Sequence, residues 1–307
     1  MSIIVENLTK KYGEQKAVND ISFEIKTGEV VGFLGPNGAG KSTTMKIITC
    51  FMAPSSGDVR LDDDSIHTNP ETIKRKIGYL PENNPLYLDM PIIDYLRFTA
   101  EIQGVPKGAI AGRIGEMIER CGLDREKHKN INELSKGYRQ RVGLAQAMIH
   151  DPEVLILDEP TTGLDPNQIV EIRKLIKDLG KEKTVILSSH ILSEVEATCD
   201  RILIINRGRI VADGTSDTLR SQSQGQELLK IHVEADPAKV ETAVRGLPSV
   251  EKVMPLDGKA GWFNVQSKPD LTSRKEIFDL CVQNKWYLME MSGLETRLED
   301  VFQKLTK

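Results

Sequence analysis

Apolar residues recur along the chain at two spacings, which predict both strands and helices. Unbroken apolar runs at 30–34, 154–157 and 184–188 are typical of strands buried on both faces of a parallel sheet. Between about 86 and 150, and again from 169 to 179, apolar residues follow the helical period. Strands that alternate with helices predict an α/β fold with a largely parallel sheet, into which a helical subdomain is inserted at about 86–150.

A second, smaller domain is predicted after a polar stretch at 221–226, whose Ser, Gln and Gly content is typical of a linker. Beyond it the pattern follows the order βαββαβ and ends in a further helix, which is typical of a ferredoxin-like unit. We therefore expect a first domain at 1–220 and a small α+β, ferredoxin-like C-terminal domain at 228–307. Its strands are expected at 228–234, 250–256, 262–266 and 286–291, and its helices at 237–246, 272–285 and 296–305.

Composition narrows the class of protein. The chain has 307 residues, of which 39% are hydrophobic and 28% charged, as in an ordinary soluble globular protein. Its net charge of −4 gives no basic footprint, so we expect no nucleic-acid partner. The four cysteines lack CxxC spacing, which favours reduced thiols in the cytoplasm over disulfides or a zinc site. No apolar stretch approaches the length of a membrane span, so the polypeptide is not expected to cross a bilayer by itself.

One stretch matches the phosphate-binding pattern G-x-x-x-x-G-K-[ST] without a mismatch. Glycines at its ends let consecutive backbone N–H groups point inward, Lys41 supplies a charge for the outer phosphates, and the Ser42 hydroxyl is placed to ligate Mg²⁺. The strand at 30–34 precedes the loop and a helix at 43–50 follows it, which argues against an ordinary Gly-rich turn. The stretch consists of Gly35, Pro36, Asn37, Gly38, Ala39, Gly40, Lys41 and Ser42.

Polar residues elsewhere have both a structural and a functional interpretation. Asp158 and Glu159 follow a buried strand, where two carboxylates are costly unless a metal or a reaction uses them; a structural salt bridge is the weaker alternative for Glu159. His190 also follows a buried strand, and by itself it would be interpreted as a loop histidine that caps a helix. Spacing alone makes turn packing and ligand contact equally good interpretations of Tyr12. Ser135 stands where a helix N-cap is expected.

These motifs occur in an order that resembles an ABC-type ATP-binding domain over about the first 215 residues. The order is the loop at 35–42, the segment 134–138 (Leu-Ser-Lys-Gly-Tyr), the segment 154–160, the segment 163–165 (Gly-Leu-Asp) and His190. The segments 78–82 and 134–141 are similar to the ABC-2 exporter branch. The whole chain is most similar to the ATP-binding subunit of the gliding-motility-associated ABC transporter.

The resemblance implies an ATPase that uses ATP and Mg²⁺. In this family two ATP-binding domains dimerise head to tail, and each nucleotide lies between the phosphate loop of one subunit and the signature loop of the other. In this chain Thr43 would extend the phosphate loop, and Ser135 and Gly137 would represent the signature loop. Glu159 would polarise the attacking water, His190 would contact the γ-phosphate, and Lys41 would hold it. Asp158 would hold Mg²⁺ through water beside Ser42, and Tyr12 would stack on the adenine.

The resemblance also implies a homodimer that drives a separate integral membrane permease, with the subunit peripheral on the cytoplasmic face of the inner membrane. Most ABC domains have Gln where this chain has Glu82. Two like charges about 4 Å apart repel each other by ~4 kcal/mol at an effective dielectric constant of ~20, so the Glu82 carboxylate cannot face a phosphate oxygen. It must face Mg²⁺ or a cationic partner instead. Lys136 and Tyr138 also depart from the usual signature.

Two other functions compete with transport. A soluble ABC ATPase acting on ribosomes or DNA would normally carry two ATP-binding domains or a long coiled-coil arm, and the span from Ser42 to Leu134 is too short for such an arm. The segment 228–307 is alternatively a regulatory module for a small ligand. It shows no clustered ligands, so a role in packing or in dimer contacts is favoured.

Overall fold

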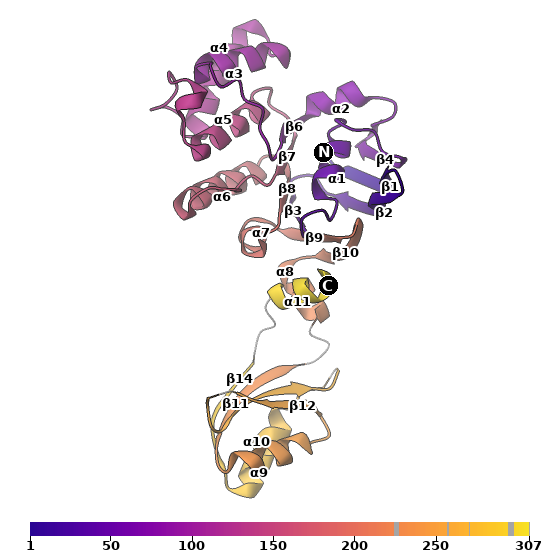
Figure 1. The fold of residues 1–307 in the computed structure, drawn as a ribbon, viewed down its shortest axis with the longest axis vertical. Coiled ribbons are helices and arrows are strands. Elements are labelled where there is room, and N and C mark those ends of the chain that lie inside the picture. The colour runs from indigo at the N-terminus through magenta and orange to yellow at the C-terminus, as the bar shows by residue number, and fades with distance from the viewer. Residues whose placement is uncertain (224–226, 257, 270, 294–297, 307) are drawn as a thin grey trace. The chain divides into compact units, whose positions relative to one another are not determined.

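The structure is a computed structural model that describes residues 1–223, 227–256, 258–269, 271–293 and 298–306. The chain divides into two compact units, Met1–Ser216 and Asp217–Leu305 (Figure 1). The division falls a few residues before the end predicted for the first domain. Within the described ranges, no helix is long and apolar enough to cross a membrane.

A six-stranded sheet forms the centre of the first unit. Its strand order is β10-β9-β3-β8-β7-β6, in which all neighbours are parallel except the pair β9 and β10. Every residue of β3, β7 and β8 is buried, as the apolar runs predicted. Because β8 pairs in parallel with both β3 and β7, the carboxyl ends of the three strands meet at one edge of the sheet. The strands are β3 (Val30–Leu34), β6 (Ile77–Leu80), β7 (Val154–Asp158), β8 (Thr184–Ser189), β9 (Arg201–Asn206) and β10 (Arg209–Gly214).

A second, antiparallel sheet has the order β2-β1-β4-β5. Its first two strands form a long hairpin, in which cross-strand pairing runs from Ile3 opposite Ile25 to Tyr12 opposite Gln15 and continues past the polar residues of both strands. Tyr12 is therefore the last residue of a strand, not part of a polar turn. The strands are β1 (Ile3–Tyr12), β2 (Gln15–Ile25), β4 (Ser56–Leu61) and β5 (Asp64–Ser65).

Helices connect and cover these strands (Figure 1). The predicted apolar stripe of α6 is buried at Ile172, Ile176 and Leu179. Ser135 is the N-cap of α5, where its hydroxyl accepts a hydrogen bond from the Tyr138 N–H. The helices are α1 (Lys41–Ile48), α2 (Pro70–Lys76), α3 (Ile92–Ile102), α4 (Lys107–Arg120), the 3₁₀ turn η1 (Ile131–Glu133), α5 (Lys136–Met148), α6 (Pro166–Gly180) and α7 (Leu192–Thr198).

The second unit has the predicted ferredoxin-like arrangement. Its antiparallel sheet has the order β12-β13-β11-β14, and α9 and α10 contribute Val240, Val244, Ile277 and Cys281 to one core with the sheet. Its elements are α8 (Ser216–Ser223), β11 (Leu228–Glu234), α9 (Pro237–Arg245), β12 (Val250–Pro255), β13 (Trp262–Ser267), α10 (Arg274–Asn284), β14 (Tyr287–Gly293) and α11 (Leu298–Thr306).

The predicted linker is wrong for residues 221–223, which end helix α8. Leu219 of that helix is buried, and this packing stabilises the helix despite its polar composition. Residues 224–226 of the predicted linker lie outside the described residues, as do residues 296–297 of the last predicted helix.

Candidate active site

The phosphate loop connects the buried strand β3 to the N-terminus of α1. A Cβ atom at Gly35 would lie 2.4 Å from the Ile205 carbonyl oxygen. Gly40 has φ of +112°, and a Cβ there would lie 2.5 Å from the Ala17 carbonyl oxygen. Both positions therefore require glycine. Ser42 follows Lys41 in the first turn of α1, where the helix dipole favours anions.

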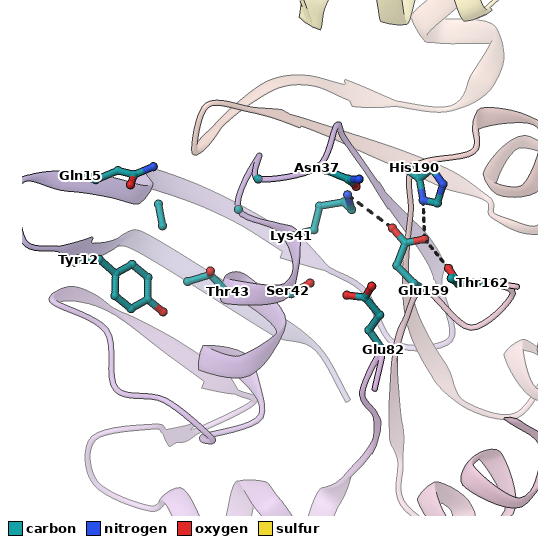
Figure 2. A pocket seen from close by; sticks show the side chains of 13 residues that line it. Tyr12, Gln15, Asn37, Lys41, Ser42, Thr43, Glu82, Glu159, Thr162 and His190 are labelled. Carbon is teal, nitrogen blue, oxygen red and sulfur yellow. Dashed lines mark hydrogen bonds and ion pairs between the residues drawn. The ribbon is translucent and has the colours of Figure 1, made fainter. Parts of the chain in front are cut away.

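A cavity of about 530 Å³ opens beside this loop, a volume within the range typical of small-molecule sites. Its walls come from the hairpin β1–β2, the phosphate loop and the ends of β7 and β8 (Figure 2). Ten of the residues predicted from the sequence line it: Tyr12, Asn37, Gly38, Gly40, Lys41, Ser42, Thr43, Glu82, Glu159 and His190. The prediction missed Gln15, Ala17 and Thr162.

Lys41 begins α1, and its side chain reaches back over the start of the phosphate loop. Its ammonium donates hydrogen bonds to the carbonyl oxygens of Gly35 (2.8 Å) and Pro36 (3.3 Å), and its Nζ lies 3.6 Å from Oε1 of Glu159. Lys41 and Glu159 are each only 6% exposed. A buried pair of opposite charges in contact is held in place strongly, because removing either partner leaves the other uncompensated.

Glu159 is oriented from both its backbone and its side chain. Its φ of +52° lies in the left-handed region, and its N–H donates to Oγ of Ser188 at 2.9 Å. On the side-chain oxygen Oε2, Nδ1 of His190 lies at 2.8 Å and the Thr162 hydroxyl donates at 3.3 Å (Figure 2). The two residues predicted for catalysis from separate strands are therefore in direct contact.

The predicted metal ligands come from three elements. Asp158 ends β7 with 1% exposure, and its Oδ1 accepts a hydrogen bond from Ser188 at 2.5 Å. Glu82 lies after β6 and points into the cavity (Figure 2). Burial, aided by the charges of Asp158 and Glu82, raises the pKa of the buried Tyr79 hydroxyl. Among the described residues no three Asp, Glu, His or Cys side chains form a cage, but Mg²⁺ needs only one or two carboxylates when substrate phosphates complete its shell.

Ser135 and Gly137 do not line the cavity of their own chain, and neither do Gly35, Pro36, Ala39 and Asp158. The first turn of α5 packs instead against the start of α6. A Cβ at Gly137 would lie 2.5 Å from Oε1 of Gln168, and a Cβ at Gly163 would lie 2.0 Å from Nζ of Lys136. The signature loop is therefore held by the segment that follows Glu159, with its Ser135 side exposed.

A parallel sheet that ends in this phosphate loop, with a buried glutamate and a histidine opposite its lysine, defines a nucleoside-triphosphate hydrolase of the P-loop class. Comparisons with known proteins specify the family. The family model described as ABC transporter matches residues 18–162. The bacitracin transport ATP-binding protein BcrA of Bacillus licheniformis is 34% identical to this chain, over an alignment that covers 99% of this chain and 98% of that protein.

The Nod factor export ATP-binding protein I of Burkholderia orbicola is 31% identical over 98% of this chain and 95% of that protein. Among solved structures, a dimeric post-hydrolysis state of an ATP-binding cassette bound to ADP and Pi superposes with a TM-score of 0.64 at 27% identity, covering 69% of this chain and 98% of that one. The chain belongs to the family of ABC transporter ATP-binding proteins, and it binds and hydrolyses ATP.

Proposed function

We propose that this chain is the ATPase subunit of an ABC-2-type exporter, that two copies close head to tail over ATP, and that the pair drives a separate membrane permease from the cytoplasmic face. The names of two relatives that match almost the whole chain, for bacitracin transport and Nod factor export, support an exporter. A gliding-motility-associated transporter is a narrower form of this proposal and rests on the sequence resemblance alone.

One observation carries the proposal of a shared site. The cavity joins Lys41 to Glu159 and His190, but Ser135 and Gly137, which the family resemblance assigns to the same nucleotide, do not line it. A second copy that presents its own signature loop would complete the site. The similar cassette bound to ADP and Pi is itself dimeric, which supports a dimer of this chain.

Within this site the side chains have distinct roles. The phosphate loop binds the phosphates through its backbone N–H groups, and Lys41 turns its charge toward them. Glu159 accepts the proton of the attacking water, while His190, held at 2.8 Å from its carboxylate, fixes that water in line. Ser42, Asp158 and Glu82 would hold Mg²⁺, which neutralises charge that develops on the phosphates. Tyr12, at the end of the hairpin, offers its ring to the adenine.

A second cavity of about 950 Å³, between β6, α2 and the helical subdomain, is the proposed docking surface for a cytoplasmic helix of the permease. Phe51 and Ile102 line it and are 73% and 67% exposed, which is unusual for large apolar side chains. Replacing both with Ser should reduce co-purification of the permease and leave the basal ATPase rate intact.

Two experiments test the proposed site: the first tests the general base, and the second tests whether two chains share the site. Glu159→Gln should lower the hydrolysis rate by about 10²–10⁴-fold and retain ATP binding, because only the general base is removed. In the second, chains with Lys41→Ala are mixed with chains with Ser135→Arg. If each site takes Lys41 from one chain and Ser135 from the other, the mixed dimer has one intact site and activity returns; if all groups came from one chain, mixing two inactive variants would restore nothing.

A further inference from the structure

Glu194 is a buried carboxylate that does not line the ATP cavity but contacts both the loop that carries Glu159 and the loop that carries His190. Glu194 belongs to the first turn of α7 and is 6% exposed. Its Oε2 accepts a hydrogen bond from the Thr161 hydroxyl at 2.6 Å and another from the Ser189 hydroxyl at 3.2 Å. Thr161 lies two residues after Glu159, and Ser189 lies immediately before His190. One oxygen atom therefore connects the loop that carries the glutamate to the loop that carries the histidine.

We infer that Glu194 is a positioning residue, which holds Glu159 and His190 in contact by tying their two loops together. This inference rests on the proposed catalytic roles of Glu159 and His190. The loops leave two different strands, β7 and β8, and past the strand ends nothing in the parallel ladder fixes one loop relative to the other. The pairing of β7 and β8 ends at Asp158 and Ser188, just before the catalytic residues.

The chemistry of Glu194 suits this role better than a purely structural one. A buried carboxylate is costly, and it is tolerated only when donors satisfy it, as the two hydroxyls do here. Leu192 and Val195, its neighbours in α7, are buried apolar residues, so an apolar side chain would anchor the helix at lower cost. The hydroxyl of Ser189 also accepts the Ile191 N–H at 3.0 Å, which fixes the backbone on the other side of His190.

The consequence should appear in the chemical step. A displacement of a catalytic group by about 1 Å can reduce a rate by about 10²-fold even when the change lies outside the site. Because Glu194 does not line the cavity, ATP binding should be preserved. Glu194→Ala is therefore expected to lower kcat by about tenfold to a hundredfold and to change KM for ATP by less than about twofold. Glu194→Gln keeps an acceptor oxygen and should recover most of the loss.

The experiment measures steady-state ATP hydrolysis by the full chain for these two variants and for Ser193→Ala, an exposed neighbour on the same turn of α7 that serves as the matched control. Thr161→Val removes the donor hydroxyl with little change in shape, and Thr161→Ser retains it. If Glu194 acts through Thr161, Thr161→Val lowers kcat, Thr161→Ser does not, and the double variant Thr161→Val with Glu194→Ala is no slower than Glu194→Ala alone.

Three results would overturn the inference. The first is a kcat of Glu194→Ala within about twofold of the native value. The second is a loss of kcat/KM that comes from a rise in KM, and the third is full additivity of the effects of Glu194→Ala and Thr161→Val on kcat. Where Glu194→Ala fails to fold, the pair Thr161→Val and Thr161→Ser decides on its own. Glu159→Gln separates this inference from the proposed function. If that variant retains full hydrolysis, the catalytic assignment fails; if it is inactive while the Glu194 and Thr161 variants are normal, only the positioning role fails.

Discussion

Ser188 is the residue whose removal should connect stability and catalysis most directly. It is fully buried at the end of β8, and its single hydroxyl accepts the Glu159 N–H at 2.9 Å and donates to Asp158 at 2.5 Å. Ser188→Ala leaves the shape of the strand unchanged but removes both bonds. Glu159 would then have a buried N–H without this partner and a left-handed backbone without its anchor.

The magnitude follows from the two bonds. A buried N–H left unsatisfied costs about 1–3 kcal/mol, and a hydrogen bond to a charged acceptor contributes about 1.5–3 kcal/mol, so the free energy of unfolding should fall by about 2.5–6 kcal/mol. The first unit spans Met1–Ser216, and in a domain of this size each kcal/mol lowers Tm by about 2–4 °C. The hydrolysis rate should fall by at least about tenfold, because Glu159 can turn away from Lys41 and His190.

Calorimetry and steady-state ATPase measurements check the two effects together. The matched control is Ser267→Ala, which removes an equally buried hydroxyl, hydrogen-bonded to Ser273 at 2.7 Å, from the C-terminal unit. That control should lower stability and leave kcat unchanged. If Ser188→Ala lowers Tm but keeps kcat within about twofold, the backbone anchor does not position Glu159, and the reasoning about its left-handed conformation is wrong.

Three further predictions concern other parts of the chain. Gly40→Ala should weaken fluorescent-nucleotide binding by at least about tenfold, because its Cβ would lie 2.5 Å from a carbonyl oxygen. The control Gly108→Ala, which has open space in α4, should retain the nucleotide affinity and raise the free energy of unfolding by about 1 kcal/mol. Equal affinities of the two variants would contradict this prediction. Burial lowers the pKa of His150, so the free energy of unfolding should fall as pH drops from about 7 to about 5, and urea titrations of His150→Gln should show a shallower fall. Phe263→Ala removes a core ring of the C-terminal unit and should cost that unit about 3–5 kcal/mol, making it protease-sensitive while the ATPase rate stays normal; a lost rate would show that the units depend on each other.

The phosphate loop and the buried strands could be predicted because their sequence signals are local. The apolar run of β3 and the glycines around Lys41 are each sufficient to specify a conformation. Ten of the cavity residues follow from these motifs and from the order in which they occur.

What the sequence did not predict depends on pairing between distant residues. Gln15 enters the cavity because it pairs with Tyr12 across a hairpin whose polar positions hide its length. Glu194 is an ordinary polar residue in sequence, and only the neighbouring ends of β7 and β8 bring it to the loop that carries Glu159. Thr162 belongs to that loop, three residues after Glu159, but nothing in its local sequence marks its hydroxyl as a partner of the carboxylate. A carboxylate in the first turn of a short helix is usually a dipole partner, so no local signal marks Glu194 as a link between two loops.

The charges around the cavity argue for a divalent cation at this site. Among the described residues that line it, Lys41 is the only lysine or arginine, while Glu82 and Glu159 bring two carboxylates. Asp158, the residue before Glu159, adds a buried carboxylate at the end of β7. Lys41 lies 3.6 Å from Glu159, and no cation among the described residues lies within salt-bridge distance of Glu82. A triphosphate adds several negative charges, each of which is repelled by a carboxylate about 4 Å away by ~4 kcal/mol at an effective dielectric constant of ~20. This repulsion is consistent with the proposed Mg²⁺ site, because a divalent cation held by Glu82 would reduce it. The proposal predicts that ATP affinity depends more steeply on the Mg²⁺ concentration in the native protein than in a Glu82→Gln variant.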